Sequence, residues 1–184
     1  FDRTFAVAIL QQGRVAEGVF LYEQALQRRD DQPIIHLNLG TVLLEQNQPA
    51  QALERFRESV RLDPRYVKGH YHMGLALVKL NRYDQAIAHY RTAIEINPDV
   101  AVAHMALGLA LAQQGRPQSA ISSLQQAVEL DPDLSQAHTT LAMVYVQQQR
   151  PGDALPHLRE SVRLEPASDV AHLRLGAVLN QLNQ

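Results

Sequence analysis

Apolar and small residues recur along this chain with a period of 34 residues, and each period contains two stretches with helical spacing. In residues 67–100, apolar side chains follow one helix face over 73–80 and again over 86–96. A short polar break at 81–84 separates the two stretches. No segment of useful length alternates apolar and polar residues with a period of two. The pattern therefore predicts helix–turn–helix repeats and no β-sheet.

A proline at the same position marks the end of each repeat. The four prolines are Pro64, Pro98, Pro132 and Pro166. Because the residue before a proline avoids the α region, the second helix of each repeat is expected to stop there. The full repeats are then 33–66, 67–100, 101–134 and 135–168, with a partial repeat at 1–32 and a half repeat at 169–184. This period predicts a single array over 1–184, with one continuous core.

Three positions of the repeat hold a small residue in every copy, and one holds a large apolar or aromatic residue. The small residues of position 8 are Ala6, Gly40, Gly74, Gly108, Ala142 and Gly176. The large residues of position 24 are Tyr22, Phe56, Tyr90, Leu124 and Leu158. Small residues let two helices approach closely, and large ones fill the space beside them. We therefore expect the two helices of each repeat to pack together at these positions.

Residues typical of helix turns and helix starts lie at the boundaries that this division into repeats predicts. Residues suited to a left-handed backbone occupy the turn inside the repeats, at Gly13, Asn47, Gly115 and Gln149. Prolines suited to a first helical turn follow, at Pro49, Pro117 and Pro151. Aspartates that can cap the next first helix follow the boundary, at Asp99, Asp133 and Asp169. Pro156 lies inside a second helix, so that helix is expected to start late or to bend.

These motifs resemble those of the tetratricopeptide repeat family, and the resemblance covers essentially all of the 184 residues. It is carried by His-Tyr-His-Met-Gly at 70–74, Ala-Ile-Ala-His-Tyr at 86–90, the stretch ending in Gly108, and the pair Asp131 and Pro132. The resemblance implies an all-α fold, an α-solenoid in which the hairpins stack into a right-handed superhelix. It also implies that first helices line a concave groove and that the groove binds a partner protein or peptide.

The family pattern selects the residues that face this groove. They are Leu37, Asn38, Thr41, Lys68, Tyr71, His72, Leu75, Val102, Met105, Leu109, Thr139 and Met143. The middle of this set is apolar, and exposed apolar patches tend to mark partner sites. We expect Leu37, Tyr71, Met105 and Leu109 to be the anchors. The alternative, that neighbouring helices bury these side chains, stays open.

Some family members hold the C-terminal carboxylate of a peptide with cations and amides at set positions. On this chain those positions are Arg3, Asn38, Lys68 and His72, while Val7 departs from the pattern. Cations and amide donors form charge-assisted hydrogen bonds to a carboxylate. The resemblance therefore implies a weaker carboxylate site near the N-terminus.

Histidine fills position 4 of five repeats, at His36, His70, His104, His138 and His172. Packed helices lie about 8–10 Å apart, whereas the ligand nitrogens of a zinc ion lie within about 2.1 Å of it. We therefore predict no metal site and interpret these residues as packing histidines with one hydrogen-bonded nitrogen. Their protonation near pH 5–6 is expected to loosen the stack.

Composition narrows the functional classes. The net charge of −2 gives no drive towards nucleic acid, there is no cysteine, and no apolar run suggests membrane insertion. No catalytic or phosphate-binding motif is present, so we predict neither an enzyme nor a cofactor. We expect a cytoplasmic chain that is a piece of a longer array. The leading hypothesis is a protein-interaction scaffold, and the alternatives are a self-assembling module that forms homo-oligomers and a substrate-recruiting arm of a larger enzyme.

Overall fold

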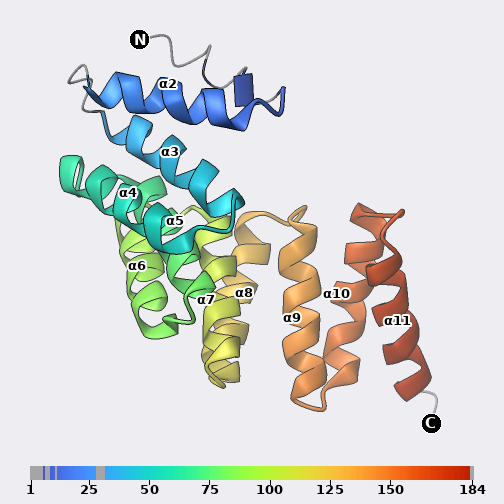
Figure 1. The fold of residues 1–184 in the computed structure, drawn as a ribbon. Helices are drawn as coiled ribbons and strands as arrows, with labels where there is room; N and C mark the ends of the chain where they lie inside the picture. Colours follow the sequence, from blue (N-terminus) through green and yellow to red (C-terminus); the bar gives the residue numbers. More distant parts are fainter. Residues whose placement is uncertain (1–5, 7–8, 11, 28–31, 183–184) are drawn as a thin grey trace. The chain divides into compact units, whose positions relative to one another are not determined.

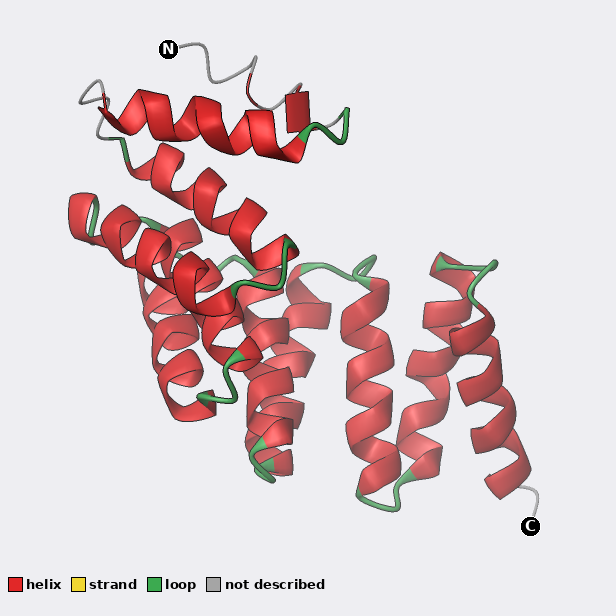
Figure 2. Ribbon diagram, viewed as in Figure 1, coloured by secondary structure: helices red, strands yellow, loops and turns green. Residues whose placement is uncertain are grey.

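The computed structural model describes residues 6, 9–10, 12–27 and 32–182, and every regular element in these ranges is an α-helix (Figures 1 and 2). The all-α repeat fold predicted from the sequence is confirmed. None of the helices in the described part of the chain combines the length and the apolar character that a membrane crossing requires.

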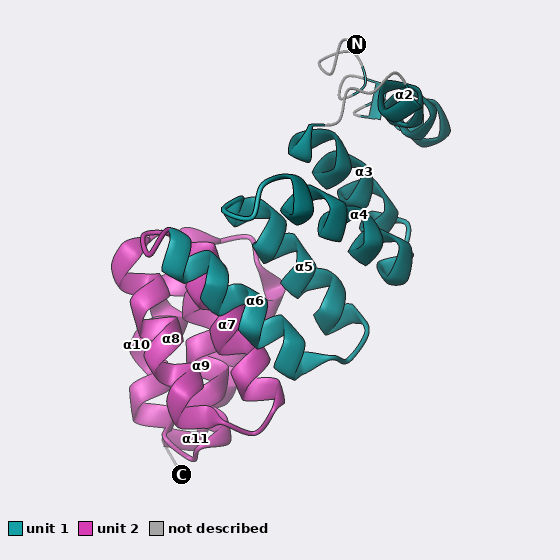
Figure 3. Ribbon diagram, turned by 90° about the vertical axis from the view of Figure 1, so that its left-hand side faces the viewer, with its two compact units in different colours: residues 1–96 teal, residues 97–184 magenta. Residues whose placement is uncertain are grey.

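The chain divides into two compact units, residues 1–96 and 97–184, shown in different colours in Figure 3. The N-terminal unit holds α2 (Val15–Gln27), α3 (Pro33–Glu45), α4 (Pro49–Leu62), α5 (Val67–Lys79) and α6 (Tyr83–Ile96). The C-terminal unit holds α7 (Ala101–Gln113), α8 (Pro117–Leu130), α9 (Ser135–Gln147), α10 (Pro151–Leu164) and α11 (Asp169–Leu182). The prediction of a single array over 1–184 stays a prediction.

Each repeat is a helical hairpin that packs on the next. In the N-terminal unit α3 packs on α4, α4 on α5, and α5 on α6. In the C-terminal unit the same order runs from α7 to α11, and the first helices α7 and α9 also touch. The large residues of position 24 form the core of the hairpins, since each is at most 1% exposed: Tyr22, Phe56, Tyr90, Leu124 and Leu158.

The turn inside each hairpin has the predicted left-handed residue. Positive φ angles occur at Gly13, Asn47, Asn81, Gly115 and Gln149, between 56° and 76°. The following prolines Pro49, Pro117 and Pro151 are the first residues of α4, α8 and α10, where a missing N–H leaves no helical bond unmade. α10 therefore begins at Pro151 and runs through Pro156, so the predicted late start is wrong.

The predicted aspartate caps are wrong. Asp169 is itself the first residue of α11, where the Ser168 hydroxyl accepts the N–H of Ala171 at 3.3 Å. The N-cap residues of α7 and α9 are Val100 and Leu134, and neither helix has a side-chain cap bond. Acidic and amide side chains instead accept backbone hydrogen bonds in the turns that precede α5, α7 and α9. The Oδ1 atom of Asp131 accepts the N–H of Asp133 at 3.1 Å, and Asn97 and Asp63 do the same for Asp99 and Arg65. These side chains tighten the turn between repeats rather than the start of the next helix.

The small residues of position 8 allow the close approach that the sequence predicts. A Cβ atom on Gly40 would lie 2.5 Å from Cε1 of Phe56, and one on Gly108 would lie 2.6 Å from Cγ of Leu124. A Cβ atom on Gly176 of α11 would meet no atom within 4 Å. The glycine is therefore required by packing in α3 and α7, but not in α11.

Candidate functional site

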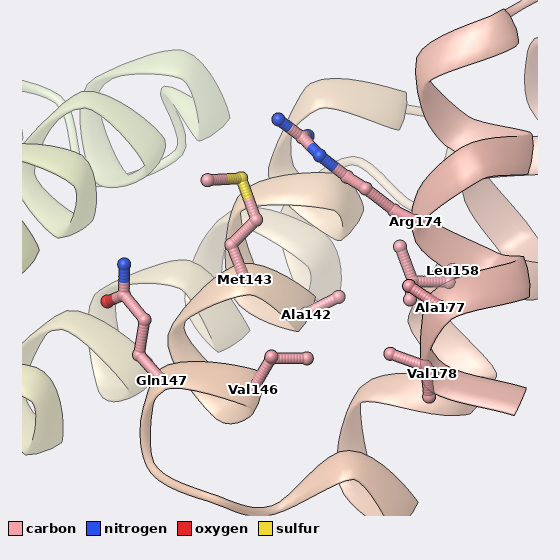
Figure 4. A pocket seen from close by; sticks show the side chains of 8 residues that line it. All are labelled: Ala142, Met143, Val146, Gln147, Leu158, Arg174, Ala177 and Val178. Carbon is pink, nitrogen blue, oxygen red and sulfur yellow. The ribbon is translucent and has the colours of Figure 1, made fainter. Parts of the chain in front are cut away.

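An apolar pocket of about 210 Å³ lies between α9 and α11 of the C-terminal unit. Met143 and Gln147 of α9 form one side, and Ala177 and Val178 of α11 form the other, as Figure 4 shows. Leu158 of α10, which is 1% exposed, closes the base. We call this the α9–α11 pocket. Its lining is complete within one unit.

Arg174 is the charged residue at this pocket. Its guanidinium extends over the pocket towards the tip of Met143 in Figure 4. The side chain is half-buried, and it makes no hydrogen bond or ion pair with any residue that the structure describes. An aliphatic pocket with an unpaired guanidinium at its rim suits a ligand that combines an apolar side chain with a carboxylate.

A second pocket of about 130 Å³ lies between α7 and α9. Leu109 and Gln113 line it from α7, and Thr140 lines it from α9. We call it the α7–α9 pocket. It shares Met143 and Gln147 with the α9–α11 pocket, so these two side chains separate two adjacent hollows on one face.

The groove residues predicted for the C-terminal unit divide by exposure. Val102, Leu109 and Met143 are 37–38% exposed, so the structure leaves them accessible. Met105 is 8% exposed and offers a partner little surface, because it packs inside the unit. Thr139 is half-buried, and its hydroxyl lies 2.7 Å from that of Ser161. Met143 is therefore a better candidate for an anchor than Met105.

The groove residues predicted for the N-terminal unit mostly have partners already. Leu37 is 4% exposed, and Thr41 donates to the Leu37 carbonyl at 2.9 Å. Tyr71 contacts His72 edge-on, with ring centroids 5.2 Å apart, and lies 6.0 Å from Tyr90. Leu75 is half-buried in the same helix. These contacts leave less free apolar surface than α9 and α11 offer.

A pocket of about 320 Å³ in the N-terminal unit has a different lining. Leu10, Val15 and Val42 are apolar, whereas Asn38 and Glu45 add an amide and a carboxylate. Tyr22 and Thr41 complete the set. A carboxylate at this pocket disfavours an anionic ligand.

The carboxylate site implied by the resemblance gains no support from these surroundings, and it stays a prediction. Arg3 lies outside the described residues. The Asn38 amide already donates to the Tyr22 hydroxyl at 3.2 Å. Burial lowers the pKa of His72, and its Nδ1 lies 2.8 Å from the Lys68 carbonyl, so the neutral ring donates there. Lys68 is exposed and remains the available cation.

The described residues contain no group of three or more His, Asp or Glu side chains that could hold a metal ion. The position-4 histidines bond to backbone carbonyls. The Nε2 atoms of His70, His104 and His138 lie 2.9–3.1 Å from the carbonyls of Pro64, Pro98 and Pro132. His70 and His138 are buried, as predicted for packing histidines, but both of their ring nitrogens have partners rather than one. His104 is half-buried and His172 is exposed.

Sequence reasoning missed Arg174, Ala177 and Val178 because the family positions were read only as far as the fifth repeat. Arg174 and Ala177 occupy positions 6 and 9 of the half repeat 169–184, the positions that select His72 and Met143 in earlier repeats. Extending the same positions into that helix would have found both.

The fold is that of a helical-hairpin repeat protein, with two adjacent pockets on the first helices of the C-terminal unit. The model of the tetratricopeptide repeat family matches residues 71–135 and 139–184, more than half of the chain. A model of anaphase-promoting complex, cyclosome, subunit 3 matches residues 11–93. The chain therefore belongs to the tetratricopeptide repeat family, whose fold supports a protein-interaction scaffold and is generally non-catalytic.

Solved structures agree with this assignment. TTC0263, a thermophilic tetratricopeptide repeat protein of Thermus thermophilus, is 26% identical, with 96% of each chain covered and a TM-score of 0.79. MamA of Desulfovibrio magneticus RS-1 is 23% identical, with 91% of this chain and 94% of its own covered and a TM-score of 0.79. YrrB, described as having an unusual peptide-binding site, is 22% identical, with 91% and 87% covered and a TM-score of 0.71. A search of curated protein sequences gives no match.

Proposed function

We propose that this chain is a scaffold that binds a segment of a partner protein on α7, α9 and α11. An aliphatic side chain of the partner enters the α9–α11 pocket, and a carboxylate of the same segment pairs with Arg174. The observation that carries the proposal is the α9–α11 pocket itself, an apolar hollow with one unpaired cation at its rim.

Free energy favours this occupant. Burying a leucine-sized side chain contributes about 1.5–3 kcal/mol. A charge-assisted hydrogen bond to a guanidinium adds to this and fixes orientation. Met143 is unbranched and adapts to ligands of different shape. A ligand with both groups should therefore bind better than one with either group alone.

The accessible groove residues extend the surface. Leu109 and Met143 line the α7–α9 pocket, and Val102 is exposed at the start of α7. Two pockets that share a wall suit two side chains of one segment. The description of YrrB as a peptide-binding protein of the same fold is consistent with this use.

Selection of a random dodecapeptide library on the immobilised protein tests the proposal. We expect enrichment of peptides that carry Leu, Ile, Met or Phe within a few residues of Asp or Glu. The Met143→Asp variant places a charge in the α9–α11 pocket and should lower the affinity of a selected peptide at least ~10-fold. Leu130→Asp is the matched control, because Leu130 is also 38% exposed but lies on the second helix α8.

The two variants distinguish loss of the site from a general effect of the added charge. Equal loss in both variants would indicate a general effect of the added charge and contradict the site. Binding that survives Met143→Asp while the variant stays helical would refute the site as well. A selected peptide synthesised with a free or an amidated C-terminus shows whether the terminal or a side-chain carboxylate is recognised.

Self-association is the second candidate, because α11 exposes a row of apolar side chains. Leu173 is 76% exposed, Val170 is 55%, and Leu182 is 42%. Light scattering over a concentration series measures this directly. A mass that rises with concentration, and that Leu173→Glu returns to the monomer value, would support self-association.

A further inference from the structure

Two pairs of histidine rings join the two helices of a hairpin, one pair in each unit. In the N-terminal unit Nδ1 of His70 on α5 lies 3.2 Å from Nδ1 of His89 on α6. In the C-terminal unit Nδ1 of His138 on α9 lies 3.1 Å from Nδ1 of His157 on α10. Both pairs have a sequence separation of 19.

The rings of each pair point at each other through these nitrogens. The ring centroids are 5.5 Å apart for His70 and His89 and 5.4 Å apart for His138 and His157. Each centroid separation is longer than the corresponding N–N distance by about twice the distance from a ring centroid to its nitrogen. Both nitrogens therefore lie close to the line that joins the two centroids. This is the geometry of an in-line N–H···N hydrogen bond. A metal ion would need both lone pairs to converge on a third point instead.

Backbone contacts fix which ring donates. Nε2 of His138 lies 3.0 Å from the Pro132 carbonyl oxygen, which can only accept, so Nε2 carries a proton. In neutral His138 the Nδ1 atom is therefore the acceptor, and His157 donates from Nδ1. His70 and its contact with Pro64 give the same assignment for the other pair.

The number of protons then decides whether the pair holds. With no added proton, His157 donates to His138. With one, a single proton still lies between the two Nδ1 atoms whichever ring carries the charge, so one ring donates and the other accepts. With two, both Nδ1 atoms carry protons and two cations face each other 3.1 Å apart.

We propose that the His138–His157 pair is a pH-sensitive contact that keeps α9 against α10 with up to one added proton and breaks it with two. His157 precedes Leu158, which closes the base of the α9–α11 pocket, so breaking the contact disturbs that pocket. This regulatory role rests on the proposed function, since it concerns the same site. Acid is then expected to weaken binding of the partner segment.

The surrounding groups are few. On α10, Asp153 acts on His157 and is itself paired with Arg150, while Glu160 lies near His138 and pairs with Arg163. On α9 the Tyr145 ring stacks on His157 at 5.9 Å. From α8 the neutral Gln125 amide donates to the Tyr145 hydroxyl, and Arg174 is the cation that α11 brings to the pocket.

Long-range ¹⁵N–¹H NMR of the wild-type chain tests the pair without any ligand. We expect His157 and His89 in the Nδ1–H tautomer at about pH 7.5. His104 is the internal control: it has the same backbone contact, to Pro98, but Ser123 stands where His89 and His157 stand in their repeats. Nε2–H tautomers at both His89 and His157 would overturn the proposal.

A binding series from about pH 7.5 to about pH 4.5 tests the link to function. The probe is a synthetic peptide taken from the library selection. The wild-type affinity should fall at least ~5-fold in acid. His157→Gln, which keeps a donor for His138 but cannot be charged, should abolish most of that fall. His89→Gln, the matched change in the other unit, should leave it unchanged.

Each result has one meaning. If no peptide binds at any pH but the Nδ1–H tautomers are present, the proposed function fails and the histidine contact stands. If peptide binds with the same pH dependence in wild type and His157→Gln, the regulatory role is refuted while the binding function stands.

Discussion

The two units are built from the same kind of helical hairpin, but the side chains on the surfaces of their first helices differ. Both bury the large residues of position 24 and both join a hairpin with a histidine pair. In the N-terminal unit the rings of Tyr71 and His72 pack on each other and on Tyr90 and Phe56. In the C-terminal unit Met143 and Arg174 border a pocket, and none of the described residues that line it is aromatic.

This difference teaches that a few first-helix side chains decide whether a repeat has room for a ligand. Aromatic rings on α5 fill the space beside their own hairpin. Met143 and the alanine at 177 leave it open. Position 24 of the hairpin core differs as well, since it is aromatic in the N-terminal unit (Tyr22, Phe56 and Tyr90) and leucine in the C-terminal unit (Leu124 and Leu158).

The largest expected effect concerns the small residues of position 8. Gly40→Ala meets three atoms of the rigid Phe56 ring at 2.5–3.0 Å, whereas Gly108→Ala meets one atom below 3.0 Å, Cγ of Leu124 at 2.6 Å, with the Ala120 carbonyl oxygen at 3.1 Å. Overpacking typically costs about 1–3 kcal/mol, so we expect a larger loss for Gly40→Ala than for Gly108→Ala. Gly176→Ala should be neutral or gain up to ~1 kcal/mol from helix propensity. Urea unfolding of the three variants measures the order, and an equal loss in all three would contradict it.

Charge reversal at the first-helix face comes next. Arg174→Glu should lower the affinity of an acidic selected peptide about 10-fold, because it replaces a charge-assisted hydrogen bond by repulsion. Lys68→Glu makes the same change on α5 of the N-terminal unit and should have little effect. Fluorescence anisotropy with a labelled peptide compares them. A greater loss with Lys68→Glu would move the site to the N-terminal unit.

A smaller effect is expected at the buried serines of position 27. The Ser59 hydroxyl donates to the Pro33 carbonyl at 2.7 Å, whereas the Ser161 hydroxyl lies among the hydroxyls of Thr139 and Ser135. Ser59→Ala removes a donor from a fixed backbone oxygen and should cost about 1 kcal/mol. Ser161→Ala should cost less, since the two remaining hydroxyls can rotate towards each other. Hydrogen exchange in α4 and α10 distinguishes the two losses.

The smallest effect concerns the pH response of the histidine pairs. Burial, then the charge of His70, then Arg57 lower the pKa of His89. Burial and the charge of His138 lower the pKa of His157, whereas Asp153 raises it. Arg57→Gln should therefore raise the pKa of His89, and Asp153→Asn should lower that of His157. NMR titration of both rings checks this, and each variant is the control for the other unit.

The sign of the stability change follows from these directions. A histidine whose pKa is lowered in the fold binds fewer protons there than in the unfolded chain, so it favours folding above its ordinary pKa of about 6.5. That contribution disappears as the pH falls through the lowered value. Arg57→Gln should reduce the acid sensitivity of the N-terminal unit, whereas Asp153→Asn should increase that of the C-terminal unit. A melting temperature that does not change between about pH 7.5 and about pH 5 would contradict any role of these rings in stability.

Much of the fold could be predicted because its causes are local. The prolines and the left-handed turn residues act within one or two turns of helix, and the small residues at position 8 act within one hairpin, as Gly40 does against Phe56. The caps predicted at Asp99 and Asp133 failed because the turns held by the Asn97 and Asp131 side chains leave the next residues, Val100 and Leu134, at the N-cap positions. Two turn conformations compete for such side chains, and sequence spacing alone does not decide between them.

The site was harder to predict because exposure depends on the neighbours in space. Met105 and Met143 have the same chemistry, yet one is 8% exposed and the other 38%. The histidine pairs were missed for a related reason, since His89 and His157 lie on second helices and were not compared with position 4. Their common separation of 19 residues, present in two repeats, was the available signal.

The wall formed by Met143 and Gln147 has a consequence for discrimination between partners. Both hollows border the same two side chains, so a segment that fills both must carry its side chains at one fixed interval. Inserting a single residue between the two side chains of the segment would displace one side chain from its pocket. Under the proposed function, the surface would therefore select partners by the interval between their apolar residues more than by the identity of those residues.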